Sequence, residues 1–244
     1  FLKFRASWGR VGKDRLKDEN GNDIRFPYLT TLGNVSSTWG TGLAENRTGS
    51  MNLKWEVSTK TNFGIDARFF DDKVDMTVDF FHTKTTDIFQ RRANIPDEGG
   101  LSNVLPYANI GSMKSWGMDG TLAYTHTFNK DMALTVRGNF THAENEVIYW
   151  EQSGVNYPYQ SNSGVPYKVQ RGLIALGLFK DEDDIKSSPK QTFMDNYRPG
   201  DIKYKDVNGD GKIDKDDVVP LNYSAVPFIQ YGFALDWNLS LIHI

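Results

Sequence analysis

The chain has 244 residues, with 28 Lys and Arg against 31 Asp and Glu, and a net charge of −3. This balance argues against nucleic-acid binding, which needs a clustered basic surface. The absence of Cys excludes disulfides, thiolate catalysis and Cys-ligated metal sites. The longest nearly apolar run, residues 172–179, is too short to cross a bilayer as a helix, but membrane β-barrel strands alternate and leave no such run.

Alternation of apolar and polar residues predicts six strands. Val74, Met76 and Val78, for example, alternate with Asp75 and Thr77. The predicted strands cover residues 1–10, 53–69, 74–80, 116–128, 132–140 and 228–239. Because the first pattern begins at Phe1 without an initiator Met or a signal peptide, we expect a fragment of a longer protein. Whether residues 241–244 are native is left open.

The connections between these strands fall into two classes. Residues 71–73 and 129–131 are predicted to be tight turns, whereas residues 11–51, 91–113 and 141–226 form long segments. Short turns at one end of a sheet and long loops at the other are typical of an outer-membrane barrel. We therefore predict an all-β fold, an antiparallel transmembrane β-barrel segment, with a large soluble β-sheet as the alternative.

The last long segment contains the one helix that we predict. Asp181 can cap its N-terminus, Glu182 to Ile185 would form it, and Pro189 would end it. Trp150, Tyr157, Tyr159 and Tyr167 lie in the same segment and are candidate glycan contacts, since aromatic rings stack on sugars. Packing within the loop is the alternative for these four residues.

Residues 206–217 match a twelve-residue calcium loop. Asp206, Asn208 and Asp210 would supply side-chain oxygens from positions 1, 3 and 5. Gly211 stands at the position that needs a positive φ. The remaining predicted ligands are the backbone carbonyl of Lys212 and the carboxylates of Asp214 and Asp217. The role would be structural, with residues 199–220 forming a calcium-loop-like insert. The alternative is an acidic turn that binds nothing.

Three passages resemble the SusC/RagA class of TonB-dependent outer-membrane transporters. They are residues 52–87, which include Asn-Leu-Lys-Trp-Glu and the Phe-Phe-Asp-Asp-Lys turn, residues 109–120, and residues 199–206 running into the calcium-like loop. The resemblance implies about six strands of a 22-stranded barrel in the outer membrane of a Gram-negative bacterium. It also implies import of oligosaccharides or peptides, not catalysis, with a SusD-like lipoprotein as a lid. TonB would act through parts absent from residues 1–244.

In this interpretation the apolar side chains face outer-membrane lipid and the polar ones line the lumen. The expected lumen residues are Lys54, Glu56, Lys60, Asp66, Arg68, Asp75, Asp79 and Arg137. Residues 150–200 would contribute to the substrate and lid surface. The alternatives are a siderophore- or haem-type receptor without a lid, a calcium-stabilised extracellular binding or adhesion module, and a carbohydrate-active enzyme, for which no site is found.

Overall fold

A computed structural model of the protein describes residues 1–244 except 18–20, 39, 96–103, 240–241 and 244. The chain divides into two compact units. The sheet unit comprises Phe1–Glu151 and Pro227–Ile244, and the loop unit comprises Gln152–Val226. Among the described residues, no helix has the length and apolar character needed to cross a membrane.

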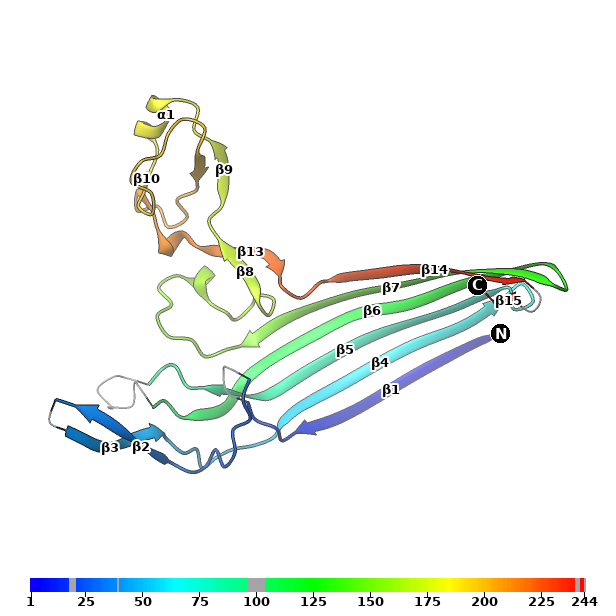
Figure 1. Ribbon diagram of the computed structural model, residues 1–244, viewed down its shortest axis with the longest axis horizontal. Coiled ribbons are helices and arrows are strands. Elements are labelled where there is room, and N and C mark those ends of the chain that lie inside the picture. Colours follow the sequence, from blue (N-terminus) through cyan, green and yellow to red (C-terminus); the bar gives the residue numbers. More distant parts are fainter. Residues whose placement is uncertain (18–20, 39, 96–103, 240–241, 244) are drawn as a thin grey trace. The chain divides into compact units, whose positions relative to one another are not determined.

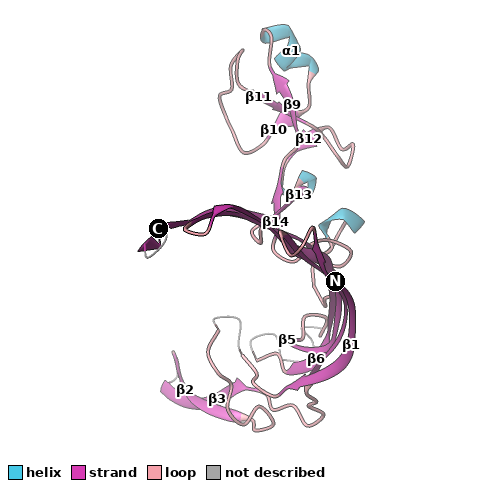
Figure 2. Cartoon of the chain, turned by 90° about the vertical axis from the view of Figure 1, so that its right-hand side faces the viewer, coloured by secondary structure: helices cyan, strands magenta, loops and turns pink. Residues whose placement is uncertain are grey.

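The sheet unit is built on one antiparallel sheet, whose strands lie side by side in Figure 1 and curve when seen end on in Figure 2. Its order is β1 (Leu2–Lys13), β4 (Glu56–Phe69), β5 (Val74–Arg91), β6 (Tyr107–Asn129), β7 (Met132–Tyr149), β14 (Ile229–Leu239) and β15 (Ile242–His243). A separate hairpin pairs β2 (Thr31–Ser37) with β3 (Gly40–Arg47). The predicted all-β antiparallel fold is confirmed, and the sheet is not closed within this chain.

Pairing register gives the sheet one apolar face and one polar face. Phe63 lies opposite Phe80, and Phe80 lies opposite Met118, so their side chains share the apolar face. This face is open: Phe233 is 83% exposed and Tyr231 is 79% exposed. A water-facing sheet would not leave so many large apolar side chains uncovered. A lipid-facing barrel wall would.

The strands extend further than the apolar pattern predicts. β5 continues to Arg91, β6 begins at Tyr107 and β7 continues to Tyr149, so the loops beyond them are shorter than expected. β4, in contrast, begins at Glu56 instead of Leu53. Before that start, the Lys54 amide donates a hydrogen bond to the Asn109 side chain at 2.8 Å instead of to a neighbouring strand.

Both predicted tight turns are present at the end of the sheet opposite the long loops. The connection between β4 and β5 is residues 70–73. In it, Phe70, Asp71 and Asp72 have φ values of 57°, 54° and 61°, a left-handed conformation that residues other than glycine seldom adopt. In the second turn the Asn129 side chain accepts a hydrogen bond from the Asp131 amide at 2.9 Å. Such local side-chain bonds explain the preference of Asn for turns.

The loop unit consists of short elements, and its strands pair with strands that lie far away in the sequence. Strand β8 (Val169–Gly172) pairs with β13 (Val219–Ser224), β9 (Ala175–Leu178) with β11 (Ile202–Tyr204), and β10 (Lys190–Gln191) with β12 (Lys212–Ile213). Its helices are η2 (Pro158–Gln160), α1 (Glu182–Ser187) and η3 (Lys215–Asp217). Among the described residues of this unit, the buried apolar side chains are Phe179, Ile213 and Val219.

The predicted helix is confirmed as α1. The Asp184 amide donates to the Asp181 side chain at 2.8 Å, which is the expected N-cap, and acidic residues fill the first turn. The helix ends before Pro189.

Candidate functional site

The polar face of the sheet carries a network of opposite charges. The Arg5 guanidinium donates to Asp66 at 2.9 Å and to Asp79 at 2.8 Å, which ties β1, β4 and β5 together. Arg68 pairs with Asp75 at 3.0 Å, and Arg137 with Asp236 at 3.6 Å. Except for Lys54, which precedes β4, the predicted lumen residues lie in the sheet strands.

A glycine makes room for the Arg5 network. Gly64 lies opposite Arg5 on β4, and a Cβ built there would collide with the Asp79 carboxylate and lie 2.7 Å from the Arg5 guanidinium carbon. Gly64 therefore allows the cation to cross the strand and reach both carboxylates. The result is a charged surface on one face of the sheet, suited to a hydrated path.

Glu151 anchors the loop ends of β5 and β7, a role that was not predicted from the sequence. Its side chain is 4% exposed and accepts hydrogen bonds from Arg92 Nε at 2.8 Å and from the Asn94 amide at 2.8 Å. The Ala93 amide donates to it at 3.2 Å. Burial alone would raise the pKa of Glu151, but these donors outweigh burial and lower it. A lone acidic residue just beyond a strand gives no sequence signal of such a role.

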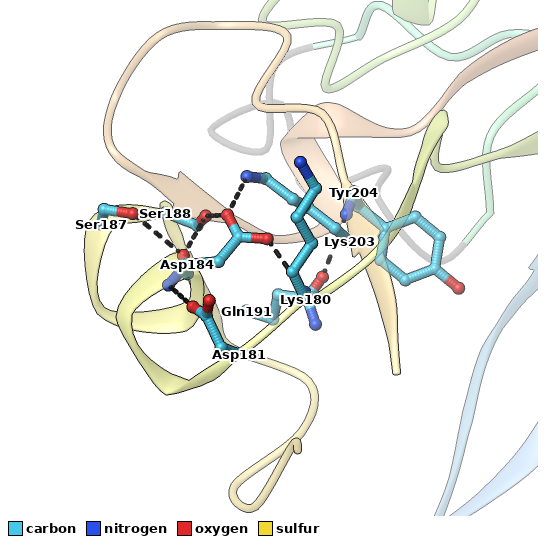
Figure 3. A network of polar contacts seen from close by, with 8 residues as sticks. All are labelled: Lys180, Asp181, Asp184, Ser187, Ser188, Gln191, Lys203 and Tyr204. Carbon is cyan, nitrogen blue, oxygen red and sulfur yellow. Dashed lines mark hydrogen bonds and ion pairs between the residues drawn. The ribbon is translucent and has the colours of Figure 1, made fainter. Parts of the chain in front are cut away.

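Asp184 fixes helix α1 to strand β11 in the loop unit (Figure 3). Its carboxylate accepts a bond from Lys203 Nζ at 2.8 Å and another from the Lys180 amide at 3.2 Å. The hydrogen bond from Lys203, reinforced by that of the Lys180 amide, lowers the pKa of Asp184. In the same view, Gln191 Oε1 accepts a bond from the Tyr204 amide at 3.2 Å.

The calcium-like loop adopts the predicted bend. Gly209 and Gly211 have φ values of 79° and 82°, which glycine adopts without strain. The two Asp206 carboxylate oxygens accept bonds from the Gly209 amide at 2.6 Å and the Gly211 amide at 2.9 Å. Asn208 Oδ1 accepts a bond from the Asp210 amide, and Asp210 Oδ1 accepts one from the Lys212 amide.

Asp217 closes this loop from its far end. Its side chain is fully buried and accepts bonds from the Val207 amide at 2.7 Å and the Asp214 amide at 2.9 Å. No Lys or Arg pairs with Asp217 in the part of the chain that the structure describes. Asp214 accepts a bond from the Asp216 amide at 2.8 Å. Among described residues, no three His, Cys, Asp or Glu side chains stand in an arrangement ready for a metal ion.

Two of the four candidate aromatic residues pack on the calcium-like loop. Tyr157 and Tyr159 stack at 5.4 Å between ring centroids, and Tyr159 donates to the Asp216 carbonyl at 2.6 Å. Asn208 Nδ2 donates to the Tyr157 hydroxyl at 3.3 Å. Burial, followed by nearby charges, raises the pKa of Tyr159, which keeps this donor protonated. These contacts favour loop packing for the pair.

The other two aromatic candidates are Tyr167 in the loop unit and Trp150 just after β7. Tyr167 is 41% exposed, and Lys168 Nζ lies 5.6 Å from its ring centroid. Trp150 belongs to the sheet unit. A glycan role for either residue stays a prediction.

Apolar side chains also gather on the surface of the loop unit. Leu178 lies opposite Ile202 where β9 pairs with β11, and these side chains are 59% and 44% exposed. Leu176, on the same strand as Leu178, is 58% exposed. We call these three residues the loop apolar patch. Exposed apolar groups gathered in this way are typical of a protein contact surface.

Comparison with known proteins supplies the family. A family model described as TonB dependent receptor-like, beta-barrel, matches residues 1–241. TonB-dependent receptor P39 of Formosa agariphila is 30% identical over 87% of this chain, and TonB-dependent receptor SusC of Bacteroides thetaiotaomicron is 25% identical over 88%. The structure of the RagAB peptide importer in the 'open-open' state matches 98% of this chain with a TM-score of 0.70 and 22% identity.

The chain corresponds to a limited part of these proteins. It spans 23% of receptor P39, 21% of SusC and 24% of the RagAB chain. The SusC/RagA resemblance of the sequence is confirmed, and the matching family is one of outer-membrane proteins. The chain belongs to the TonB-dependent receptor β-barrel family.

Proposed function

We propose that the chain is part of a TonB-dependent importer that carries large nutrients across the outer membrane of a Gram-negative bacterium. The observation that carries this proposal is the two-faced sheet of a TonB-dependent receptor barrel. Its apolar face suits lipid, and its polar face suits a hydrated lumen. In a whole barrel, the charge pairs of Arg5, Arg68 and Arg137 would line the path of the nutrient.

The surface of the loop unit favours a second protein that would act as a lid. A SusD-like lipoprotein is the partner that we propose, because the loop apolar patch offers exposed Leu176, Leu178 and Ile202 for a protein contact. The proposed substrate is an oligosaccharide or a peptide. The name of the RagAB neighbour, a peptide importer, supports the second class. TonB would act through parts of the protein beyond residues 1–244.

The test uses the full-length receptor, tagged and extracted from outer membranes in mild detergent. We expect a lipoprotein to co-purify in a one-to-one ratio. Leu178→Glu together with Ile202→Glu should abolish co-purification of the lipoprotein. The control is Asp195→Lys at an exposed residue, which also changes the charge by two units and should leave co-purification unchanged. A receptor that purifies alone would favour the hypothesis of a siderophore- or haem-type receptor without a lid. Recovery in the soluble fraction would overturn the membrane assignment.

We also propose a structural calcium ion in the 206–217 loop. The donors are hard oxygens, and the Asp206, Asn208 and Asp210 side-chain oxygens retain lone pairs beside their single N–H bonds. Asp217 is a buried carboxylate without a cationic partner among the described residues, and such a charge is costly. With Lys212 and Asp214, these residues would hold the ion, whose charge would offset that cost.

Limited proteolysis of the full-length receptor tests the calcium proposal. Calcium should protect residues 196–222 from cleavage relative to a chelator, because the ion would cross-link the loop. Asp206→Asn with Asp210→Ala should abolish the protection, and the exposed Asp195→Asn should retain it. Equal cleavage of the wild type with calcium and with chelator would refute the site.

A further inference from the structure

A row of cationic side chains crosses the apolar face at the loop end of the sheet. Arg10 lies opposite Thr59, Thr59 opposite Lys84, and Lys84 opposite Lys114. The register of β5 is unbroken from Val74 to Thr85, and that of β6 from Met113 to Tyr124. Lys84 and Lys114 therefore share a face with Phe80 and Met118. Side chains of opposite residues are neighbours, so the row brings three cations onto the lipid-facing side.

This row is electrostatically unfavourable as it stands. Like charges directly opposite on neighbouring strands destabilise a sheet, and Lys84 and Lys114 are such a pair. Lys114 Nζ forms an ion pair with the Glu146 carboxylate at 3.0 Å and lies 5.3 Å from the centroid of the Trp116 ring. For Arg10 and Lys84, both exposed, the described part of the chain offers no ion pair. An external anion would satisfy both.

The neighbouring side chains on this face define a membrane interface. One row closer to the tight turns lie Trp8, His82 and Trp116, and beyond them the face is apolar. Trp is enriched where a barrel wall meets the lipid headgroups. The acidic side chains next to the row are Glu144 and Glu146 on β7. Glu146 is held by Lys114, and Glu144 lies 3.4 Å from His142.

A hollow lies below the cations on the same face. Gly120 and Gly138 form its floor, on neighbouring strands, and Met76, Val78, Met118, Leu122 and Phe140 surround it. Its volume is about 330 Å³. A Cβ built at Gly138 would meet nothing closer than 3.9 Å, so the missing side chain leaves the space open.

The separation of the two features fits one lipid. From Lys114 to Gly120 and Leu122 the strand rises about 20–27 Å, which a tilt of about 40° reduces to roughly 15–21 Å across the membrane. One leaflet of a hydrocarbon core about 30 Å thick is about 15 Å deep. An acyl chain whose headgroup lies at the cations therefore reaches the depth of the hollow.

We propose that this face binds the phosphorylated glycolipid of the outer leaflet. Arg10, Lys84 and Lys114 would contact its phosphate, and the end of one acyl chain would fill the hollow at Gly138. The inference rests on the proposed outer-membrane function, because the long-loop end of such barrels is the extracellular one. A phosphate on a lipid anchor provides the anion that Lys84 and Arg10 lack.

The headgroup part is tested on the full-length receptor in detergent by native mass spectrometry. The probes are purified lipid A, which is a phosphorylated glycolipid of the outer leaflet, its dephosphorylated form, and phosphatidylglycerol. Arg10→Gln with Lys84→Gln should weaken lipid A binding about 30-fold, at a typical surface contribution for each cation. Lys60→Gln removes an exposed cation from the neighbouring residue of β4, on the polar face, and should leave binding unchanged.

The hollow is tested by Gly138→Leu, which should weaken the binding of lipid A but not of a short-acyl derivative. Gly9→Leu, on the polar face of β1, is the control. Equal binding of dephosphorylated lipid A or of phosphatidylglycerol, or equal loss in the control variants, would overturn the proposal. Membrane fractionation of each variant separates the two claims: a receptor in the outer membrane that binds no lipid A refutes only this inference.

Discussion

Single residues at the ends of the strands hold the loops in place, and Glu151 is the clearest case. Its buried carboxylate accepts bonds from Arg92 and from the Ala93 and Asn94 amides. Glu151→Ala should lower the free energy of local opening by about 1–3 kcal/mol, the cost of buried donors left without an acceptor. Hydrogen exchange at residues 92–94 of the full-length receptor would measure it. The control is Glu144→Gln, because the Glu144 side chain is about half exposed, and it should leave the exchange at residues 92–94 unchanged.

The pH dependence of this anchor follows from the lowered pKa of Glu151. Because the folded protein binds the proton more weakly than the unfolded chain, the stabilisation is complete above the ordinary glutamate pKa. It is lost as the pH falls through the lowered folded value. Exchange at residues 93 and 94 should therefore accelerate in acid beyond its intrinsic pH dependence. An unchanged protection factor across this range would contradict the assignment.

In the loop unit, Asp184 should stabilise its surroundings as Glu151 does, and lose this effect in acid. Asp184→Asn removes the acceptor charge for Lys203 and should loosen the attachment of α1 to β11, as seen by faster proteolysis between residues 180 and 190. Asp183→Asn is the matched control, because the Asp183 side chain is 92% exposed and pairs with Lys186 at the surface of the helix. The lowered pKa of Asp184 means that the wild type loses this contribution only in acid. Equal cleavage of both variants would argue against the role.

At the scale of elements, local alternation located the six long strands but not their ends. Beyond Phe80 and Met118 the apolar face turns polar, with His82, Lys84 and Lys114, so both faces carry polar groups and the period-two signal fades. The backbone ladder continues regardless. The hairpin of β2 and β3 gave no signal either, since glycines and polar residues dominate it.

The loop unit marks the limit of sequence reasoning. Helix α1 and the bend at Gly211 were predictable because their signals are local: an N-cap followed by acids, and a glycine at a fixed loop position. The pairs of β8 with β13 and β9 with β11 join residues far apart in the chain, so local periodicity cannot reveal them. The hydrogen bond from the Tyr159 hydroxyl to the Asp216 carbonyl also joins residues far apart in the chain, and it was open for the same reason.

The junction of β1, β4 and β5 depends on the missing side chain of Gly64. Gly64→Ala should push Arg5 away from Asp79 and so weaken the tie between the three strands, which should lower the unfolding temperature of the barrel. The measurement is the temperature at which the full-length barrel loses its folded mobility in electrophoresis. Gly9→Ala, where a Cβ meets nothing within 4 Å, is the control. Equal temperatures for the two variants would show that the network tolerates the methyl group.

At the scale of the whole molecule, the sheet has two features that water does not satisfy. Its apolar face leaves Phe4, Phe233 and Leu235 more than 60% exposed, and its outer strand β1 pairs, within the described residues, only with β4. Unpaired edges and uncovered apolar faces both lead to association between chains. In a longer receptor, further strands and lipid would cover them.

We therefore expect residues 1–244, expressed alone, to aggregate in water and to stay dispersed only in detergent. Analytical ultracentrifugation with and without detergent would measure this. A triple change to Ser at Tyr231, Phe233 and Leu235, which removes apolar side chains of β14 but no ladder bonds, should reduce aggregation. The same change at the polar-face residues Gln230, Ala234 and Asn238 should not. A monomeric, water-soluble wild-type fragment would favour the extracellular module over the barrel wall, because only a module covers its own apolar surface.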